Sequence, residues 1–355
     1  MVKGRLRKLR ARLRQEKCDA ALITGVSDVR YLSGFSGDDS WVVIGLADKP
    51  VLVTDSRYTE QAKSEAPLYR IVQRKTPLSA RSAAIFTKMK ASRIAFDPGQ
   101  LTVSSFDAVS KELKRAGLVP ISGLVKKLRQ IKDASEIKII RRATRIAEKA
   151  FLKVKAKLRP GMTEKQIANL IEMYLREAGA EKSSFDTITA VRERASLAHA
   201  RATNRVLTER DPLLVDWGAL HRLYCSDLTR VILPDRIRPK LREVYQIVLE
   251  AQNRAIRKIR PGVSLRAVDA TARDYIAKSG YGKYFGHGLG HGVGLDIHEL
   301  PILGATAEGI LKPGMVFSVE PGIYLPGQLG VRIEDLVLVT STGCELLSHL
   351  EKKLV

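Results

Sequence analysis

Cysteine is scarce in this sequence, and the residues that occur, Cys18, Cys225 and Cys344, lie far apart. An odd number of distant thiols argues against a disulfide framework and fits a reducing compartment. Long apolar runs are also lacking, because none approaches the roughly 18 residues that indicate a membrane-spanning helix. The basic start, MVKGRLRKLRARLRQEK, precedes only a short apolar stretch, unlike an export signal. We therefore expect a cytoplasmic protein with free, inert thiols and no membrane contact.

Acidic residues are outnumbered, 38 against 61 basic ones, so that the formal net charge is +23. Such an excess attracts nucleic acid and other anionic partners. The sequence nevertheless has neither zinc-finger spacing nor the aromatic motif of ribonucleoprotein domains. Within residues 126–158 the apolar side chains recur at helical spacing, and basic residues fill the other side. We therefore interpret the charge mainly as solvated helix faces and expect at most weak, non-specific nucleic-acid contact.

The 355 residues, 45% of them hydrophobic, suffice for two globular domains. Up to about residue 122, basic helical stretches alternate with short apolar runs such as DAALITG and PVLVTD, a pattern typical of an α/β domain. After GLVPISGLVKKLRQIKDASEI the character changes to a long amphipathic helix, which places the boundary near Gly123. We therefore predict one domain at residues 1–122 and a second at residues 123–355.

The second part contains an internal repeat with an offset of 101 residues, since LRPGMTEKQIANLIEMYLREAGA begins at Leu158 and IRPGVSLRAVDATARDYIAKSGY begins at Ile259. In each copy a Pro-Gly turn and a hydroxyl residue, Thr163 or Ser264, introduce an amphipathic helix that ends at a glycine. We expect both helices to lead into strands that carry acidic residues.

The segment FGHGLGHGVGLDIHE, residues 285–299, places three histidines among five glycines. At roughly 1 kcal/mol for each glycine relative to alanine, a helix is disfavoured. No glycine here begins a G-x-G-x-x-G pattern, so a dinucleotide-binding loop is excluded. We expect extended or turning chain, in which the glycines allow other backbone or a ligand to approach closely.

Carboxylates interrupt otherwise apolar, strand-like runs at Asp216, Asp227, Glu320 and Glu334. Buried charges of this kind need compensation. Separate salt bridges to Arg230 and Arg332 are one explanation. Together with His291, however, the acids form a carboxylate-rich set with one nitrogen, which suits two divalent metals bridged by shared carboxylates. Hard oxygen ligands favour manganese over a thiolate-type zinc site.

The same residues carry a resemblance to a known family. The strings DWGALHRLYCSD, GLGHGVGLDIHE, VEPGIYLPG and VRIED resemble the metallopeptidases of the pita-bread fold, and within them the aminopeptidase P and prolidase group. DVRYLSGFSGDDSWVVI and PVLVTDSRYTEQA resemble that group's creatinase-like first domain. The resemblance implies an α/β creatinase-like N-terminal domain followed by an α+β pita-bread catalytic domain, duplicated about a pseudo-twofold axis. A methionine aminopeptidase normally lacks the first domain, and creatinase lacks the complete ligand set.

The resemblance also implies a role for each matching residue. The implied metal ligands are Asp216, Asp227, His291, Glu320 and Glu334, with Asp227 and Glu334 bridging two ions. The implied substrate-contacting or proton-transferring histidines are His199, His287 and His298. Tyr324 and Arg332 match positions that orient or stabilise the reacting centre, and Glu320 is also the implied proton acceptor. Glu299 and Asp335 are implied to support the site without acting directly.

The implied reaction is hydrolysis of the bond between an N-terminal residue and a following proline, with two divalent metal ions, preferably Mn²⁺ but alternatively Co²⁺ or Zn²⁺. Ile302 stands where some prolidases place an arginine that holds a dipeptide's carboxylate. We therefore expect an Xaa-Pro aminopeptidase acting on peptides with proline in second position, with an Xaa-Pro dipeptidase (prolidase) as the alternative. A non-enzymatic relative that binds RNA or ribosomes is a further alternative, although such relatives usually lose ligands. The family also implies a homodimer or larger homo-oligomer.

One segment departs from the family pattern. Val191 and Arg192 stand where many relatives carry Ser-Gly, and Ala200 follows His199 where glycine is common. We expect the substrate wall to differ at this segment.

Overall fold

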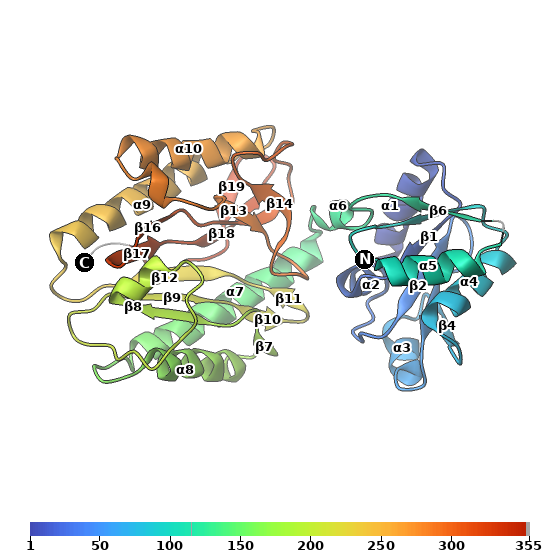
Figure 1. Ribbon diagram of the computed structural model, residues 1–355, viewed down its shortest axis with the longest axis horizontal. Coiled ribbons are helices and arrows are strands. Elements are labelled where there is room, and N and C mark those ends of the chain that lie inside the picture. Colours follow the sequence, from blue (N-terminus) through green and yellow to red (C-terminus); the bar gives the residue numbers. More distant parts are fainter. Residues whose placement is uncertain (115, 353–355) are drawn as a thin grey trace. The chain divides into compact units, whose positions relative to one another are not determined.

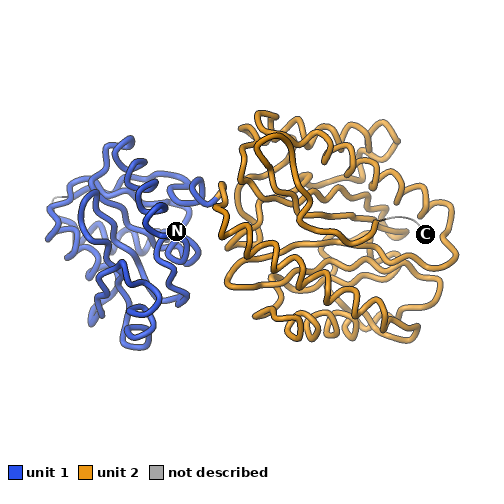
Figure 2. The backbone as a smooth tube through the Cα atoms, turned by 180° about the vertical axis from the view of Figure 1, so that it is seen from behind, with its two compact units in different colours: residues 1–129 blue, residues 130–355 orange. Residues whose placement is uncertain are grey.

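The computed structural model describes residues 1–114 and 116–352, and the chain divides into two compact units, Met1–Arg129 and Gln130–Val355 (Figure 1, Figure 2). Within the described residues, no helix combines the length and apolar character needed to cross a membrane. Cys18, Cys225 and Cys344 are free thiols, as expected, and the first two are buried.

Unit 1 is an α/β domain, as its alternating pattern predicted. Its elements are α1 (Val2–Gln15), β1 (Ala20–Ile23), α2 (Val26–Ser33), β2 (Trp41–Gly45), β3 (Val51–Thr54), α3 (Thr59–Glu65), β4 (Arg70–Gln73), α4 (Leu78–Lys88), β5 (Arg93–Phe96), α5 (Val103–Glu112), β6 (Gly117–Pro120) and α6 (Lys126–Arg129). The strands form one sheet in the order β4-β3-β2-β1-β5-β6, in which β2 is antiparallel to both β1 and β3. The apolar runs used for the prediction become its central strands.

The short segment that follows Gly123, up to Arg129, belongs to unit 1. Arg12 of α1 donates hydrogen bonds to the carbonyls of Gly123 and Leu124 at 3.0 and 3.2 Å. Arg129 at the end of α6 forms a buried ion pair with Asp28 of α2, 2.8 Å between Nη1 and Oδ1. These contacts, which the sequence pattern does not reveal, are why the compact unit extends to Arg129, whereas the sequence placed the boundary at residue 122.

Unit 2 contains the internal repeat. Its elements are α7 (Ala134–Lys155), α8 (Glu164–Glu177), β7 (Lys182–Ser183), β8 (Ile188–Val191), the 3-10 helix η1 (Arg192–Ser196), β9 (Leu213–Trp217), β10 (Ala219–His221), β11 (Tyr224–Cys225), β12 (Leu228–Ile232), α9 (Pro239–Lys258), α10 (Leu265–Lys278), the 3-10 helix η2 (Gly282–Tyr284), β13 (Gly290–Gly292), β14 (Glu299–Leu303), β15 (Val316–Val319), β16 (Gly322–Leu325), β17 (Leu329–Arg332), β18 (Asp335–Val339) and β19 (Cys344–Leu346). Figure 1 shows α9 and α10 on one side of the strands and α7 and α8 on the other.

The two repeated helices are capped as predicted. The Thr163 side chain accepts a hydrogen bond from the Gln166 N–H at the start of α8, and the Ser264 side chain accepts from the Ala267 N–H at the start of α10. Gly179 and Gly280, which follow the two helices, have φ of 104° and 88°, where a side chain would be strained. The equivalence extends to the loops, since isolated bridges join Thr163 to Val206 and Ser264 to Ile310.

The predicted long amphipathic helix is α7, but the helical spacing of residues 126–158 is divided between α6 and α7. Asp133 is the N-cap of α7, where its carboxylate accepts from the Ser135 and Glu136 N–H groups and the Glu136 side chain accepts from the Asp133 N–H. This capping box starts a new helix, separate from α6. The apolar spacing predicted helical structure correctly but did not reveal the break.

Candidate metal centre and active site

The first pair of acids is brought together by two paired strands. Asp216 lies in β9, and Asp227 lies immediately before β12, which runs antiparallel to β9 and places Thr229 opposite Asp216. Both carboxylates are buried. Because side chains on one strand alternate between faces, Asp227 and Thr229 point to the same side. The strand pairing therefore directs three polar side chains into one interior region.

The histidine-rich segment is extended, as predicted, and its glycines allow very close backbone packing. His291 is the central residue of β13, which pairs with β14 and β15 and has a bulge between His291 and Gly292. A Cβ atom at Gly290 would lie 1.9 Å from the Ser318 carbonyl oxygen, and one at Gly292 would lie 2.2 Å from the Leu300 carbonyl oxygen. No side chain fits at either position, so the glycines let His291 stand between two neighbouring strands.

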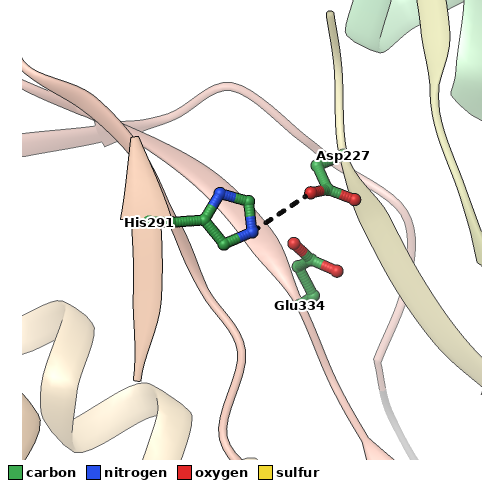
Figure 3. Close-up of side chains that lie close together, drawn as sticks. All are labelled: Asp227, His291 and Glu334. Atoms are coloured by element: carbon green, nitrogen blue, oxygen red, sulfur yellow. Dashed lines mark ion pairs between the residues drawn. The ribbon is translucent and has the colours of Figure 1, made fainter. Parts of the chain in front are cut away.

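Asp227, His291 and Glu334 converge on one point, with one potential ligand atom from each lying within 4.8 Å of the others (Figure 3). His291 Nε2 lies 3.5 Å from Asp227 Oδ2 and 3.2 Å from Glu320 Oε1. The structure thus gathers residues that are up to 107 positions apart in the sequence, the separation of Asp227 and Glu334 (334 minus 227).

Asp216 joins this group through Arg332, whose Nη2 donates to Asp216 Oδ2 at 2.6 Å. One of the salt bridges weighed from the sequence is therefore present. The other is not, because Arg230 pairs with Asp335 at 2.7 Å and reaches only the backbone carbonyl of Glu334. In the part of the chain that the structure describes, the four carboxylates of this group are paired only with the guanidinium of Arg332 and the imidazole of His291, so the acids outnumber their positive partners.

Two buried oxygens indicate that this group can bind a cation. Among the described residues, Asp216 Oδ1 and Glu334 Oε1 have no hydrogen-bond partner, and burying an unpaired charged oxygen is costly. Burial and the neighbouring Glu334 raise the pKa of Asp227 well above its usual range, and burial and Glu320 do the same for Glu334. Burial opposes ionisation of Glu320, but the hydrogen bond and charge of His291 outweigh it and lower the Glu320 pKa to about 2. The set fits divalent cations, which supply the charge that the protein does not.

The remaining candidate residues surround this group. The Tyr324 hydroxyl lies 2.9 Å from His287 Nε2 and accepts a hydrogen bond from Arg332 Nη1 at 2.8 Å. The His298 ring lies 4.1 Å from the His291 ring between centroids. Burial lowers the pKa of His287 and of His298, which favours neutral imidazoles. The neutral imidazoles of His287 and His298 can each donate one hydrogen bond and accept another, and the Tyr324 hydroxyl can do the same.

His199 reaches the same region from a different segment. It is exposed, in the loop that follows η1, and its charge contributes to lowering the pKa of both His287 and His298. Arg332 Nη1 donates to the carbonyl oxygen of Ala198 at 3.1 Å, which attaches this loop to the centre of the site.

Two hydroxyl residues were missed from the sequence. Thr229 donates to Glu334 Oε2 at 2.7 Å and accepts from Arg332 Nε at 3.0 Å. Ser318 donates to Glu320 Oε1 at 2.9 Å and accepts from the His291 N–H at 3.0 Å. Both lie two residues from a candidate acid, on the same face of the chain, and this alternation was the available signal.

Comparisons with known proteins agree with this architecture. The model of metallopeptidase family M24 matches residues 138–341, and that of the creatinase/prolidase N-terminal domain matches residues 5–131. An Xaa-Pro dipeptidase from Pyrococcus furiosus is 36% identical, covering 100% of each chain. The structure of an Xaa-Pro dipeptidase from Bacillus anthracis superposes with a TM-score of 0.96 at 40% identity, covering 100% of this chain and 99% of the other. That of an X-Pro aminopeptidase from Thermotoga maritima has a TM-score of 0.88 at 38% identity, covering 96% and 99%.

Proposed function

The chain belongs to metallopeptidase family M24, with a creatinase-like N-terminal domain before a pita-bread catalytic domain, and we propose that this hydrolase is an Xaa-Pro dipeptidase. The observation that carries the proposal is the convergence of Asp216, Asp227, His291, Glu320 and Glu334, two of them with unpartnered buried oxygens, beside three further histidines. The presence of all five candidate ligands argues against the non-enzymatic alternative, because such relatives usually lose ligands.

The preference for dipeptides is supported by relatives rather than by the sequence argument. The sequence favoured an aminopeptidase because Ile302 replaces an arginine that could hold the substrate's carboxylate. The relatives named as Xaa-Pro dipeptidases, at 36% and 40% identity over essentially the whole chain, favour the alternative. Ile302 lies in β14 and is 58% exposed. Because Ile302 has no positive charge, it cannot hold the substrate's carboxylate as an arginine would. This difference alone does not determine the length of the preferred substrate.

We propose that two divalent ions, preferably Mn²⁺ on the basis of the oxygen-rich donors, are held by the five converging residues. When bound, such ions lower the pKa of a water molecule and polarise a carbonyl group. Glu320 would accept the proton of the attacking water and transfer it toward the leaving imide nitrogen of proline. His298 would donate a hydrogen bond to the carbonyl oxygen as negative charge develops on it.

Arg332 and Tyr324 would act by orientation. Arg332 donates hydrogen bonds to four groups at once, so its guanidinium is held firmly; they are Asp216, Tyr324, Thr229 and the Ala198 carbonyl. The Tyr324 hydroxyl in turn lies beside His287. This connected set would keep the carboxylates and histidines in one arrangement while substrate enters. Catalysis by proximity and orientation requires such a fixed arrangement.

The test compares hydrolysis of Leu-Pro, Leu-Pro-Gly and Leu-Gly by protein that has been stripped with chelator and reconstituted with Mn²⁺. We expect the highest kcat/KM for Leu-Pro, lower activity on Leu-Pro-Gly and little on Leu-Gly. Release of leucine from Leu-Pro-Gly with Leu-Pro untouched would instead establish the aminopeptidase, which the Thermotoga maritima neighbour and Ile302 favour. Activity on none of the three peptides would refute both.

A further inference from the structure

Glu164 is a fully buried carboxylate outside the metal-binding group. It is the first residue of α8, and its side chain has an exposed fraction of 0%. Both oxygens lie 3.0 Å from Arg194 Nε. Oε1 also accepts from the Val191 N–H at 2.9 Å, and Oε2 accepts from the N–H and hydroxyl of Thr203 at 2.9 and 2.6 Å. A buried acid with this many donors is fully satisfied and rigidly oriented.

All of these donors belong to one segment, residues 191–203, which also carries His199. The backbone of α8 holds the end of the same segment, because the Glu164 N–H donates to the Arg205 carbonyl and the Lys165 N–H to the Thr203 carbonyl, both at 3.0 Å. Arg194 extends the network by donating to the Arg201 carbonyl at 2.7 Å. Glu164 therefore binds the segment both before and after His199.

The segment is also attached on the side of the active site. The Ala198 carbonyl accepts from Arg332 at 3.1 Å, and a Cβ atom at Gly330 of β17 would lie 1.8 Å from the Ala195 carbonyl oxygen. His199 is thus carried by a loop that Glu164 holds on both sides of the histidine and that Arg332 holds at Ala198, the residue before it.

The internal repeat shows that helix initiation does not require this acid. The residue equivalent to Glu164 at the offset of 101 is Leu265, which is the first residue of α10 and is also buried. Its N–H donates to Gly309, so the backbone arrangement resembles that at Glu164, whose N–H donates to Arg205. The half that carries His199 has a carboxylate at this position, whereas the other half has an apolar side chain. The difference indicates a task specific to the loop.

Arg192 provides a second sign that the loop is held under constraint. Its φ is 56°, in the left-handed region where a non-glycine residue costs of order 1–3 kcal/mol. The conformation is retained because the Arg192 N–H donates to the Pro212 carbonyl at 2.9 Å and its guanidinium pairs with buried Asp211 at 2.8 Å. Backbone strain of this kind persists where surrounding contacts hold the residue in its unfavourable conformation.

We propose that Glu164 is a positioning residue for His199, fixing the loop so that the imidazole faces the substrate. The proposal rests on the proposed function, in which His199 contacts the peptide. In the variant Glu164→Gln the volume is kept, but the ion pair between the carboxylate and Arg194 Nε is lost and an NH₂ group faces other donors. The loop then loses its single geometry. Because misplacement by about 1 Å can reduce a rate by about 10²-fold, we expect kcat/KM to fall by roughly that factor or somewhat less.

The experiment is a double-mutant cycle of Glu164→Gln and His199→Ala on the metal-reconstituted 355-residue protein. If Glu164 acts through His199, the double variant has nearly the activity of His199→Ala alone, and bound metal is unchanged in every variant. Thr163→Ala is the matched control, because it removes the N-cap hydroxyl of the same helix and leaves the Glu164 carboxylate and its contacts with the loop in place. It should lower the free energy of unfolding by about 1 kcal/mol and leave kcat/KM intact.

A readout independent of turnover keeps the two proposals separable. The chain has six histidines, so ¹³C-labelled imidazole signals of the diamagnetic zinc-loaded protein can be assigned by substitution. We expect Glu164→Gln to shift or broaden the His199 signal and to leave that of His221 unchanged. An unchanged His199 signal, or activity losses that simply add in the cycle, would overturn the positioning role. Inactivity of the wild-type protein on Xaa-Pro peptides, with the His199 signal still perturbed, would overturn the proposed function alone.

Discussion

Lys132 and Glu299 form a buried ion pair, with 2.8 Å between Nζ and Oε1 and side chains that are 1% and 4% exposed. Glu299 follows His298 directly and pairs in register with Gly292, the residue after His291. The Lys132 N–H donates to the Gly314 carbonyl at 2.8 Å. The pair therefore connects the chain before α7 to the hairpin that carries two candidate histidines, which agrees with the supporting role that the family resemblance implied for Glu299.

Lys132→Met is expected to destabilise unit 2 strongly. Removing one partner of a buried pair leaves an uncompensated charge and typically costs about 3–5 kcal/mol. Lys153→Met is the matched control, because Lys153 and Glu177 are 2.9 Å apart but 42% and 48% exposed, and such surface pairs contribute less than about 1 kcal/mol. The measurement is urea unfolding of both variants. An equal loss in the free energy of unfolding for both variants would show that the buried pair stabilises the protein no more than a surface pair does.

Glu334→Gln is expected to abolish hydrolysis and to stabilise the metal-free protein. Burial and the nearby Glu320 raise the Glu334 pKa well above its usual range, so the folded state already disfavours this charge when no cation is bound. Thermal unfolding in chelator should show a higher Tm than wild type, whereas added Mn²⁺ should raise the Tm of the wild type more. Glu345→Gln, at a partly exposed carboxylate paired with Arg141, is the control. Full activity in Glu334→Gln would contradict its assignment as a ligand.

Alanine variants of the three histidines in residues 285–299 are expected to differ in metal content and in kinetics. His291→Ala removes the nitrogen that lies near Asp227 and Glu320, so metal content and turnover should fall together. His298→Ala should retain metal and lose about 10²–10³ in kcat, the usual effect of removing one donor to a developing oxyanion. His287→Ala should also retain metal but alter substrate positioning through Tyr324. Metal analysis beside steady-state kinetics checks this, and equal metal loss in all three would show the histidines to be misassigned.

RNA binding is expected to be weak and strongly dependent on salt, because the basic excess is interpreted as solvated surface. Where phosphate contacts dominate, log K falls linearly with log salt concentration as counterions are released. The measurement is fluorescence anisotropy with two unrelated RNA sequences between low and physiological salt. Tight binding at physiological salt that distinguishes the two sequences would support a nucleic-acid function in addition to hydrolysis.

Several parts of the fold were predictable because local chemistry determines them. The hydroxyl caps and terminal glycines identified α8 and α10, since helix ends depend on nearby residues. The site acids stood out because a carboxylate in an apolar strand requires compensation. Alternating apolar runs identified the α/β unit in the same way.

Other features depend on contacts that no local pattern reveals. Glu164 reads as an ordinary first-turn acid at a helix start, and only the folded chain brings Thr203, 39 positions away, to its carboxylate. Lys132 reads as one more basic residue in a basic segment, although it is buried against Glu299. The break before α7 was missed because apolar spacing continues across it. The preference for an aminopeptidase rested on Ile302 alone, and whole-chain similarity to dipeptidases favours the alternative.

The most direct test of the proposed metal centre is calorimetric titration of Mn²⁺ into chelator-treated protein, with Leu-Pro hydrolysis assayed at each metal ratio. We expect two bound ions per chain and hydrolysis that is absent without metal and recovers as the sites fill. Undiminished hydrolysis by the metal-free protein, or metal binding that survives unchanged in Asp227→Asn, would contradict it.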